Sequence, residues 1–265
     1  MALLEINGLT KQFGGIVAVN DVNFTVEKDS ITGLIGPNGA GKTTIFNLIT
    51  GVYKVSSGSI VFDGNHIENK ETYKIADAGI TRTFQNIRLF KKLSVYENIL
   101  TACQYNANYN IAESMIFGFL PEKIFGNTRF FKEERALKEQ ATELMEIMGL
   151  SDRKDFIANN LPYGLQRRLE IARALALNPK LLLLDEPAAG MNPDETEKLT
   201  ELIYFIRKKF NLTVLLIEHH MDLVMGTCDK IVVLNFGCKL AEGTPKEIQE
   251  NTKVKEAYLG GANNA

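Results

Sequence analysis

The sequence has little cysteine, no excess of one charge and no long apolar run. Its three cysteines, Cys103, Cys228 and Cys238, lack the CxxC spacing of zinc sites and argue against a disulfide framework, a usage typical of a reducing compartment. We therefore interpret the chain as cytoplasmic. Thirty Lys and Arg residues against 32 Asp and Glu residues give a formal charge of -2, so no overall basic field would attract nucleic acid or anionic lipid. No window approaches the roughly 18 apolar residues that span a bilayer, so any membrane role must come through partners.

The chain does contain the alternation of short strands and helices that is typical of an α/β domain. An apolar run at 31–35 ends at Gly36, and residues 43–49 have the apolar spacing of a helix, which predicts a strand-loop-helix unit. Further strands are expected at 3–6, 22–26, 60–62, 181–184, 214–217 and 231–234, and further helices near 194–209 and 220–227. The later alternation predicts a parallel sheet covered on both faces.

Between about 86 and 160 the pattern becomes mainly helical, and 131–148 is its clearest amphipathic run. We interpret this region as an inserted helical lobe. The run 111–125 is too short, and too interrupted by Pro121, to span a membrane. Two readings stay open for it, a helix packed within the lobe and a surface patch that meets a membrane subunit.

The segment GPNGAGKTT matches the phosphate-binding pattern G-x-x-x-x-G-K-[ST]. Its glycines allow backbone N–H groups to close around phosphate oxygens, and the start of the following helix adds partial positive charge. We expect Lys42 to reach the β- and γ-phosphates and Thr43 to supply a hydroxyl to Mg²⁺. The predicted phosphate cradle comprises Gly36, Pro37, Asn38, Gly39, Ala40, Gly41, Lys42, Thr43 and Thr44.

A second motif, LLLLDEP, places two carboxylates at the end of a buried strand. In α/β sheets the carboxyl ends of the strands are where ligands bind. Beside a magnesium phosphate, we expect Asp185 to act on the metal side and Glu186 to act as the general base that orients the attacking water. Together with the phosphate cradle, this strand predicts a nucleotide hydrolase.

In the order of these motifs, and over nearly its whole length, the chain resembles the nucleotide-binding subunits of ATP-binding-cassette transporters. The resemblance implies an α/β fold, a P-loop NTPase cassette with a parallel core sheet, an antiparallel β subdomain and an inserted helical lobe. Residues 1–265 would form one such domain, in which 1–85 and 161–265 are the nucleotide-binding core and 86–160 the helical lobe. ATP and Mg²⁺ are the implied cofactors.

The resemblance also implies roles for three further residues. Phe13 matches the aromatic residue that stacks on adenine, although a core phenylalanine would look alike in sequence. Gln85 matches the glutamine that ligates Mg²⁺, senses the γ-phosphate and links the site to the helical lobe. His219 matches the switch histidine that contacts the γ-phosphate, with His220 as the competing imidazole.

The family's signature segment, L-S-G-G-Q, presents backbone amides and a serine hydroxyl to the nucleotide of a second subunit. Here Tyr163 and Gly164 stand at the two glycine positions and are the implied nucleotide contacts. Pro162 brings neither a hydroxyl nor an N–H, and Leu165 replaces the glutamine. In the loop after the acidic strand, Asn192 stands where the family usually has aspartate, which puts a side-chain contact across the subunits in doubt.

Several segments are similar to the branched-chain amino-acid importer branch of this family, namely LPYGLQRRLEIARAL, GITRTFQNIRLFKKLSVYENI and EAYLG. The resemblance implies an ATPase at the cytoplasmic face of the cell membrane that drives solute uptake by ATP-driven closure of two cassettes. The implied partners are a second cassette, identical or similar, integral membrane permease subunits and, indirectly, an extracellular solute-binding protein, without nucleic acid.

Three alternatives remain. The cassette could serve another cargo, such as polar amino acids, peptides or lipopolysaccharide. It could be a soluble cassette of DNA repair or translation, although such proteins typically carry a long coiled-coil insertion or two cassettes in one chain. It could also be a regulatory cassette that hardly turns ATP over. Glu186 and His219 argue against this alternative, while Pro162, Leu165 and Asn192 keep it open.

Overall fold

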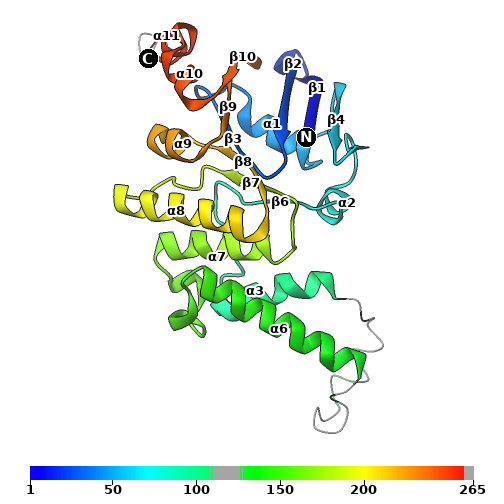
Figure 1. Cartoon of the computed structure of the whole chain (residues 1–265). Helices are drawn as coiled ribbons and strands as arrows, with labels where there is room; N and C mark the ends of the chain where they lie inside the picture. The colour runs from blue at the N-terminus through cyan, green and yellow to red at the C-terminus, as the bar shows by residue number, and fades with distance from the viewer. Residues whose placement is uncertain (108, 110–125, 127, 260–265) are drawn as a thin grey trace. The chain divides into compact units, whose positions relative to one another are not determined.

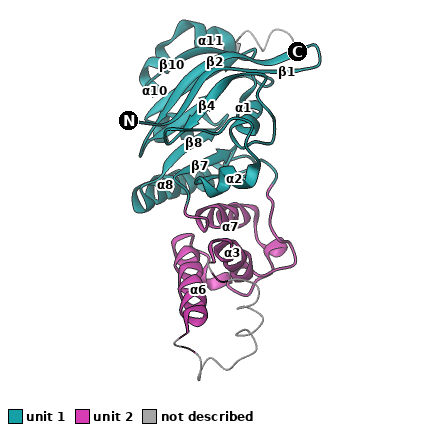
Figure 2. Cartoon of the chain, turned by 90° about the vertical axis from the view of Figure 1, so that its right-hand side faces the viewer, with its two compact units in different colours: residues 1–86, 179–265 teal, residues 87–178 magenta. Residues whose placement is uncertain are grey.

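The computed structural model describes residues 1–107, 109, 126 and 128–259. The run 111–125 lies outside the described residues, so neither reading of it is tested. The chain divides into two compact units, which Figure 2 colours separately: unit 1 comprises 1–86 and 179–265, and unit 2 comprises 87–178. None of the described helices combines the length and the apolar content needed to cross a bilayer.

In the described chain, the larger sheet of unit 1 has six strands in the order β10-β9-β3-β8-β7-β6. Their bounds are Ile31–Ile35 (β3), Ile80–Arg82 (β6), Leu181–Asp185 (β7), Thr213–Ile217 (β8), Lys230–Asn235 (β9) and Cys238–Gly243 (β10). Neighbouring strands are parallel except the edge pair β9-β10. Every residue of β3, β7 and β8 is buried, as expected of parallel strands covered on both faces. The predicted parallel sheet is confirmed.

This sheet brings the polar ends of three strands to one edge. Because β3, β7 and β8 run in the same direction, the residues that follow them lie beside one another. Gly36 follows β3, Glu186 follows β7 and Glu218 follows β8. The motifs are far apart in the sequence, and the sheet topology is what assembles them.

The smaller sheet of unit 1 is antiparallel, with the order β2-β1-β4-β5. Its strands are β1 (Ala2–Phe13), β2 (Ile16–Glu27), β4 (Ser57–Phe62) and β5 (Asn65–His66). Helix α1 (Lys42–Ile49) buries Ile45, Phe46 and Ile49 in one apolar cluster with residues of both sheets, such as Leu4 and Leu183. The helix that follows the phosphate loop is therefore anchored on two sides.

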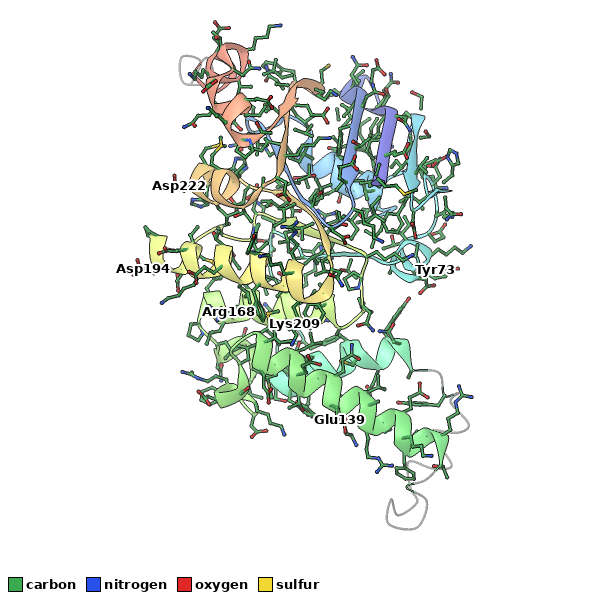
Figure 3. All side chains as sticks on the ribbon, in the orientation of Figure 1. Tyr73, Glu139, Arg168, Asp194, Lys209 and Asp222 are labelled. Atoms are coloured by element: carbon green, nitrogen blue, oxygen red, sulfur yellow. The ribbon has the colours of Figure 1, made fainter. Side chains whose placement is uncertain are left out.

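The remaining described helices of unit 1 are α2 (Thr72–Asp77), α8 (Pro193–Phe210), α9 (Met221–Thr227), α10 (Pro245–Glu250) and α11 (Thr252–Leu259) (Figure 1). The longest of them, α8, has an acidic first turn and a basic last turn, which matches the helix dipole. Figure 3 labels one residue of each kind, Asp194 near its start and Lys209 near its end.

Unit 2 is helical where it is described. Its elements are α3 (Val95–Cys103), η1 (Gln104–Asn106), α6 (Arg129–Ile147), η2 (Ser151–Arg153), η3 (Ala158–Asn160) and α7 (Tyr163–Leu175). The amphipathic run predicted at 131–148 is α6, whose buried residues include Leu137, Ala141 and Leu144. Helix α3 begins with a capping box at Ser94 and packs against both α6 and α7.

Residues 161–178 group with the helical unit, whereas the sequence-based division places them in the nucleotide-binding core. The physical reason is that α7 packs on α3 and α6. The division of one cassette into a core and a lobe stays a prediction.

Candidate nucleotide site

A hollow in unit 1 gathers most of the predicted site residues. Its lining residues are Ala18, Asn38, Gly39, Ala40, Gly41, Lys42, Thr43, Thr44, Gln85, Glu186 and His219. Ten of these eleven residues, all except Ala18, were predicted for the site from the sequence, and they come from four separate segments of the chain. The structure therefore brings together the loop, Gln85, the predicted general base Glu186 and the predicted switch histidine His219.

The loop conformation requires glycine at two of its positions. Gly36 has φ +151° and Gly41 has φ +98°, values that side-chain-bearing residues rarely adopt. A Cβ atom on Gly36 would lie 2.2 Å from the carbonyl oxygen of Leu234, and one on Gly41 would lie 2.7 Å from that of Ala18. Within the described residues, no side chain caps the first N–H groups of α1 and its first turn carries no acid. The start of α1 can therefore receive an anion.

Lys42 is buried and turned onto the loop itself. Its Nζ donates hydrogen bonds to the carbonyl oxygens of Gly36 at 2.7 Å and Pro37 at 2.9 Å. Burial lowers the pKa of Lys42, and the nearby carboxylates of Glu186 and Asp185 act in the opposite direction. Two carbonyl groups thus hold the ammonium within the hollow.

Glu186 lies between Gln85 and His219, two of the residues predicted to act on the γ-phosphate. Its Oε2 accepts a hydrogen bond from Gln85 Nε2 at 2.8 Å, and its Oε1 lies 2.9 Å from His219 Nε2. Its backbone has φ +47°, an uncommon value for a residue with a side chain. Such conformations persist only where the surroundings impose them, and they cluster at functional sites. His219, and not His220, is the imidazole that contacts Glu186.

Asp185 is buried, and its partner is a residue that the motifs did not single out. Arg82 Nη2 donates to Asp185 Oδ2 at 2.6 Å, and the two side chains are 7% and 3% exposed. Arg82 Nη1 donates to Asn47 Oδ1, also at 2.6 Å. The sequence signal was present, because Arg82 is a lone charge within the short strand Ile80–Arg82 of a largely apolar sheet.

Glu218 is a second residue that the motifs missed. Its side chain is buried and accepts three backbone N–H groups, from Ala188 at 2.7 Å, His219 at 2.8 Å and His220 at 3.1 Å. It therefore joins the loop after Glu186 to the segment that carries His219. An acid placed directly after the apolar run 214–217 was the available signal.

Phe13 is not among the residues that line the hollow. Its ring is 42% exposed and packs edge-on against Tyr53, with 5.1 Å between centroids. The ammonium of Lys11 lies 4.8 Å from the centre of the Phe13 ring. Its exposure excludes a role as a core phenylalanine, and stacking on adenine stays a prediction.

Comparison with known proteins agrees with this geometry. The model of the "ABC transporter" family matches residues 19–189, and a model described as "Branched-chain amino acid ATP-binding cassette transporter" matches residues 238–263. The chain belongs to the ATP-binding-cassette transporter family. The family, the fold and the ATPase assignment predicted from the motifs are thereby confirmed.

Individual relatives extend the match to nearly the whole cassette. The high-affinity branched-chain amino acid transport ATP-binding protein BraF of Pseudomonas aeruginosa is 47% identical over 260 residues, which cover 98% of each chain. The protein LivG of Escherichia coli K12, which bears the same description, is also 47% identical with the same coverage. The solved ADP conformation of MJ1267, an ATP-binding cassette of an ABC transporter, is 32% identical, has a TM-score of 0.81 and covers 98% of this chain and 99% of its own.

The signature segment of this cassette begins α7, in unit 2. Pro162 precedes the helix and no side chain of the described residues caps it, so its first N–H groups have no side-chain acceptor. Tyr163 is 42% exposed, and its hydroxyl accepts a hydrogen bond from Arg167 Nη2 at 3.1 Å. Gln166 Nε2 donates to the carbonyl of Leu161 at 2.8 Å, so this amide is used locally and does not replace the missing signature glutamine.

Asn192 has a local task in the cassette. It precedes α8 and forms a capping box, in which its Oδ1 accepts from the N–H of Glu195 at 2.9 Å and its own N–H donates to Glu195 Oε2 at 3.1 Å. Asparagine and aspartate cap helices about equally well. This accounts for asparagine at a position where the family usually has aspartate.

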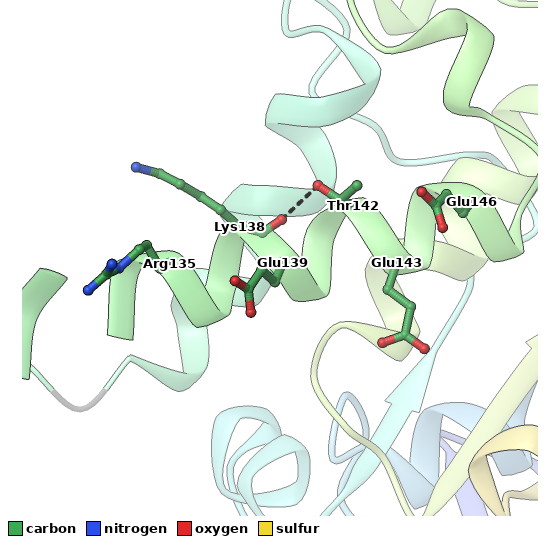
Figure 4. Close-up of a pocket in the computed structure, with 6 residues that line it drawn as sticks. All are labelled: Arg135, Lys138, Glu139, Thr142, Glu143 and Glu146. Carbon is green, nitrogen blue, oxygen red and sulfur yellow. Dashed lines mark hydrogen bonds between the residues drawn. The ribbon is translucent and has the colours of Figure 1, made fainter. Parts of the chain in front are cut away.

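Two further hollows lie elsewhere on the cassette. One lies along the charged face of α6, and Figure 4 shows its lining residues Arg135, Lys138, Glu139, Thr142, Glu143 and Glu146. The other lies between α8 and α9 and includes His220. Of the described residues that line them, none belongs to the predicted nucleotide site, so the hollow at the phosphate loop stays the predicted place of nucleotide binding.

Proposed function

We propose that the chain is the ATP-hydrolysing subunit of an importer for branched-chain amino acids. The observation that carries hydrolysis is Glu186, held by Gln85 and His219 beside the phosphate loop. The proposed cargo is supported by the full-length similarity to BraF and by the match of residues 238–263 to the branched-chain model.

The residues expected to hold Mg²⁺ are Thr43, Gln85 and Asp185. They supply hydroxyl, amide and carboxylate oxygens, the hard donors that this ion prefers. Thr43 is exposed at the start of α1, and Oδ1 of Asp185 accepts no hydrogen bond from any described side chain. This donor set fits the ion. Bound Mg²⁺ would neutralise charge that develops on the phosphates.

In the proposed reaction, the N–H groups of the loop and of the start of α1 bind the phosphates of ATP. Lys42 exchanges its contacts with the carbonyls of Gly36 and Pro37 for the β- and γ-phosphates. Glu186 orients the attacking water and takes its proton, while His219 holds Glu186 in place and contacts the γ-phosphate. Gln85, which contacts Glu186 directly, would report the state of the site to the rest of the chain.

The wider assembly is part of the same proposal. Two cassettes would close on ATP, each offering the start of its α7, with Tyr163 and Gly164, to the nucleotide of the other. Hydrolysis would reopen them. The chain would act at the cytoplasmic face of the membrane, bound to integral permease subunits, which an extracellular solute-binding protein would supply with cargo.

The test is transport by the assembly that copurifies with the tagged chain from its native membranes. After reconstitution into liposomes, we expect ATP-dependent uptake of radiolabelled leucine and no comparable uptake of radiolabelled histidine. The same assembly with Lys42→Ala should lose nucleotide binding and uptake together. Uptake of histidine without leucine would overturn the cargo alone, whereas an assembly without ATPase activity would overturn the motor function.

A further inference from the structure

Arg82 contacts three parts of the nucleotide site although no motif assigns it a role. Its two Nη atoms donate to Asp185 and to Asn47, both at 2.6 Å. Its Cζ atom lies 5.4 Å from the centre of the Phe46 ring and 5.3 Å from that of Phe84. Asn47 and Phe46 belong to α1, Asp185 ends the acidic strand, and Phe84 directly precedes Gln85 in the sequence.

This environment suits a guanidinium better than an ammonium. The planar fork donates to two oxygens on different elements at once, and its faces lie near aromatic rings, an arrangement that the compact ammonium of lysine does not reproduce. With side chains 7% and 3% exposed, Arg82 and Asp185 form a buried ion pair. A buried pair is weak evidence for stability alone, because desolvation of both charges offsets much of the attraction. Stability alone therefore does not explain this pair, and its geometry points to a role in arranging the site.

Asp185 makes two hydrogen bonds that leave its Oδ1 atom available for a metal ion. Its Oδ2 is engaged by Arg82, and its backbone N–H donates to Thr83 Oγ1 at 3.3 Å. Among the described residues, no side chain donates to Oδ1. Arg82 also ties this carboxylate, through Asn47, to the helix that carries Thr43 four residues earlier. Two of the three residues expected to hold Mg²⁺, Thr43 and Asp185, thus lie on elements that one guanidinium joins.

We propose that Arg82 is a positioning residue for the metal side of the site: by holding Asp185 through Oδ2 and α1 through Asn47, it keeps Oδ1 and the Thr43 hydroxyl in place for Mg²⁺ and its water. The inference rests on the proposed function, since it assumes an Mg²⁺-dependent nucleotide site. Arg82 itself touches neither nucleotide nor metal in this proposal.

The test measures metal binding separately from turnover. The full chain is incubated with a non-hydrolysable ATP analogue, and Mn²⁺ is titrated as a spectroscopic stand-in for Mg²⁺ by electron paramagnetic resonance. Because loss of a residue that orients a metal ligand typically weakens metal affinity about 10–100-fold, we expect a shift of that size for Arg82→Gln. Arg82→Lys, which keeps the charge but not the fork, and Asn47→Ala, which frees one arm, should each give a smaller weakening. Affinity for the analogue in EDTA should stay within about twofold, since the loop supplies those contacts.

A matched control removes another buried arginine. Arg167, in the helical unit, donates to Glu170 at 2.7 Å, with side chains 0% and 6% exposed. Arg167→Gln should lower Tm while leaving the half-saturating Mn²⁺ concentration unchanged. If Arg82 were merely structural, Arg82→Gln would behave in the same way, lowering Tm without moving the Mn²⁺ titration.

The outcomes separate this proposal from the proposed function. Wild-type chain without Mn²⁺-dependent analogue binding would overturn the proposed function. Wild-type chain that binds Mn²⁺, together with an Arg82→Gln variant that binds it equally or more tightly, would overturn the role of Arg82 alone. If Arg82→Gln gives no cooperative melt, Arg82→Lys and Asn47→Ala decide, and an unchanged titration in both overturns the proposal.

Discussion

The two helix starts that the motifs assign to phosphate, at α1 and at α7, are built differently. The start of α1 follows a glycine loop and shares its hollow with Lys42, Gln85, Glu186 and His219. At the start of α7 the polar side chains make local contacts, of Tyr163 with Arg167 within the helix and of Gln166 with the carbonyl of Leu161 just before it.

The comparison separates a helix start surrounded by the predicted catalytic residues from one whose polar side chains are used locally. Both starts lack a side-chain cap and a first-turn acid, but so do α2 and α6, which makes this feature permissive and not diagnostic. What distinguishes α1 is that the predicted catalytic residues Gln85, Glu186 and His219 line the same hollow as its start. Unit 1 therefore carries the predicted catalytic residues around its helix start, whereas the start of α7 in unit 2 stays the predicted contact for the nucleotide of a second cassette.

The largest effect is expected on kcat when the predicted general base, Glu186, is replaced. Glu186→Gln keeps the size of the side chain but removes the general base, so we expect kcat of the assembled transporter to fall by about 10²–10⁴ with ATP affinity retained. Steady-state ATPase rates and equilibrium nucleotide binding check this. The neighbouring imidazole gives a control, since His220→Gln should leave kcat within about twofold because His220 does not line the hollow. Wild-type turnover in Glu186→Gln would remove this residue from the role of base.

The next largest effect is expected on stability, when the buried Arg167–Glu170 ion pair of α7 is changed. Arg167→Met removes the buried ion pair with Glu170, which should lower the free energy of unfolding by about 3–5 kcal/mol. The double variant Arg167→Met/Glu170→Leu removes both charges and should be more stable than the single one. Urea unfolding followed by circular dichroism measures both. A double variant that is no more stable than Arg167→Met would show that this pair is not the source of the loss.

A smaller effect is expected at Glu218, whose carboxylate joins the loop after Glu186 to the segment that carries His219. Glu218→Gln replaces one carboxylate oxygen with an NH₂ group that cannot accept the N–H of Ala188 or those of His219 and His220. We expect a loss of about 1.5–3 kcal/mol in the free energy of unfolding and a lower kcat, because His219 loses its anchor. Exposed Glu197→Gln on α8 is the matched control and should change stability by at most about 0.5 kcal/mol. Equal stabilities of the two variants would contradict the anchoring role.

Much of the fold could be predicted because its signals are local. The five-residue strands β3, β7 and β8 appear in the sequence as short apolar runs, and the glycine pattern marks the loop whose φ values require glycine. The amphipathic spacing of 131–148 likewise predicted α6 within two residues at its start.

The residues that sequence reasoning missed depend on contacts between distant segments. Arg82 meets Asp185 across 103 positions of the chain, and Glu218 meets Ala188 across 30. Neither belongs to a local pattern, and only the pairing of neighbouring strands brings these partners together. The same limit applies to α7, which packs on α3 about 70 residues upstream, so that its membership of the helical unit is not visible in its own sequence.

The smallest effect is expected at Asn192, which caps α8 and stands where the family usually has aspartate. Asn192→Ala removes the acceptor for the N–H of Glu195 and should lower the free energy of unfolding by about 1 kcal/mol. Asn192→Asp keeps the cap and places a negative charge at the positive end of α8, so its stability should equal or slightly exceed that of the wild type. Thermal unfolding ranks the three proteins. ATPase rates of the assembled transporter then separate capping from a contact between subunits: Asn192→Asp should leave turnover unchanged if capping is the whole task of this side chain, whereas faster turnover at equal stability would show that an aspartate acts across the paired cassettes.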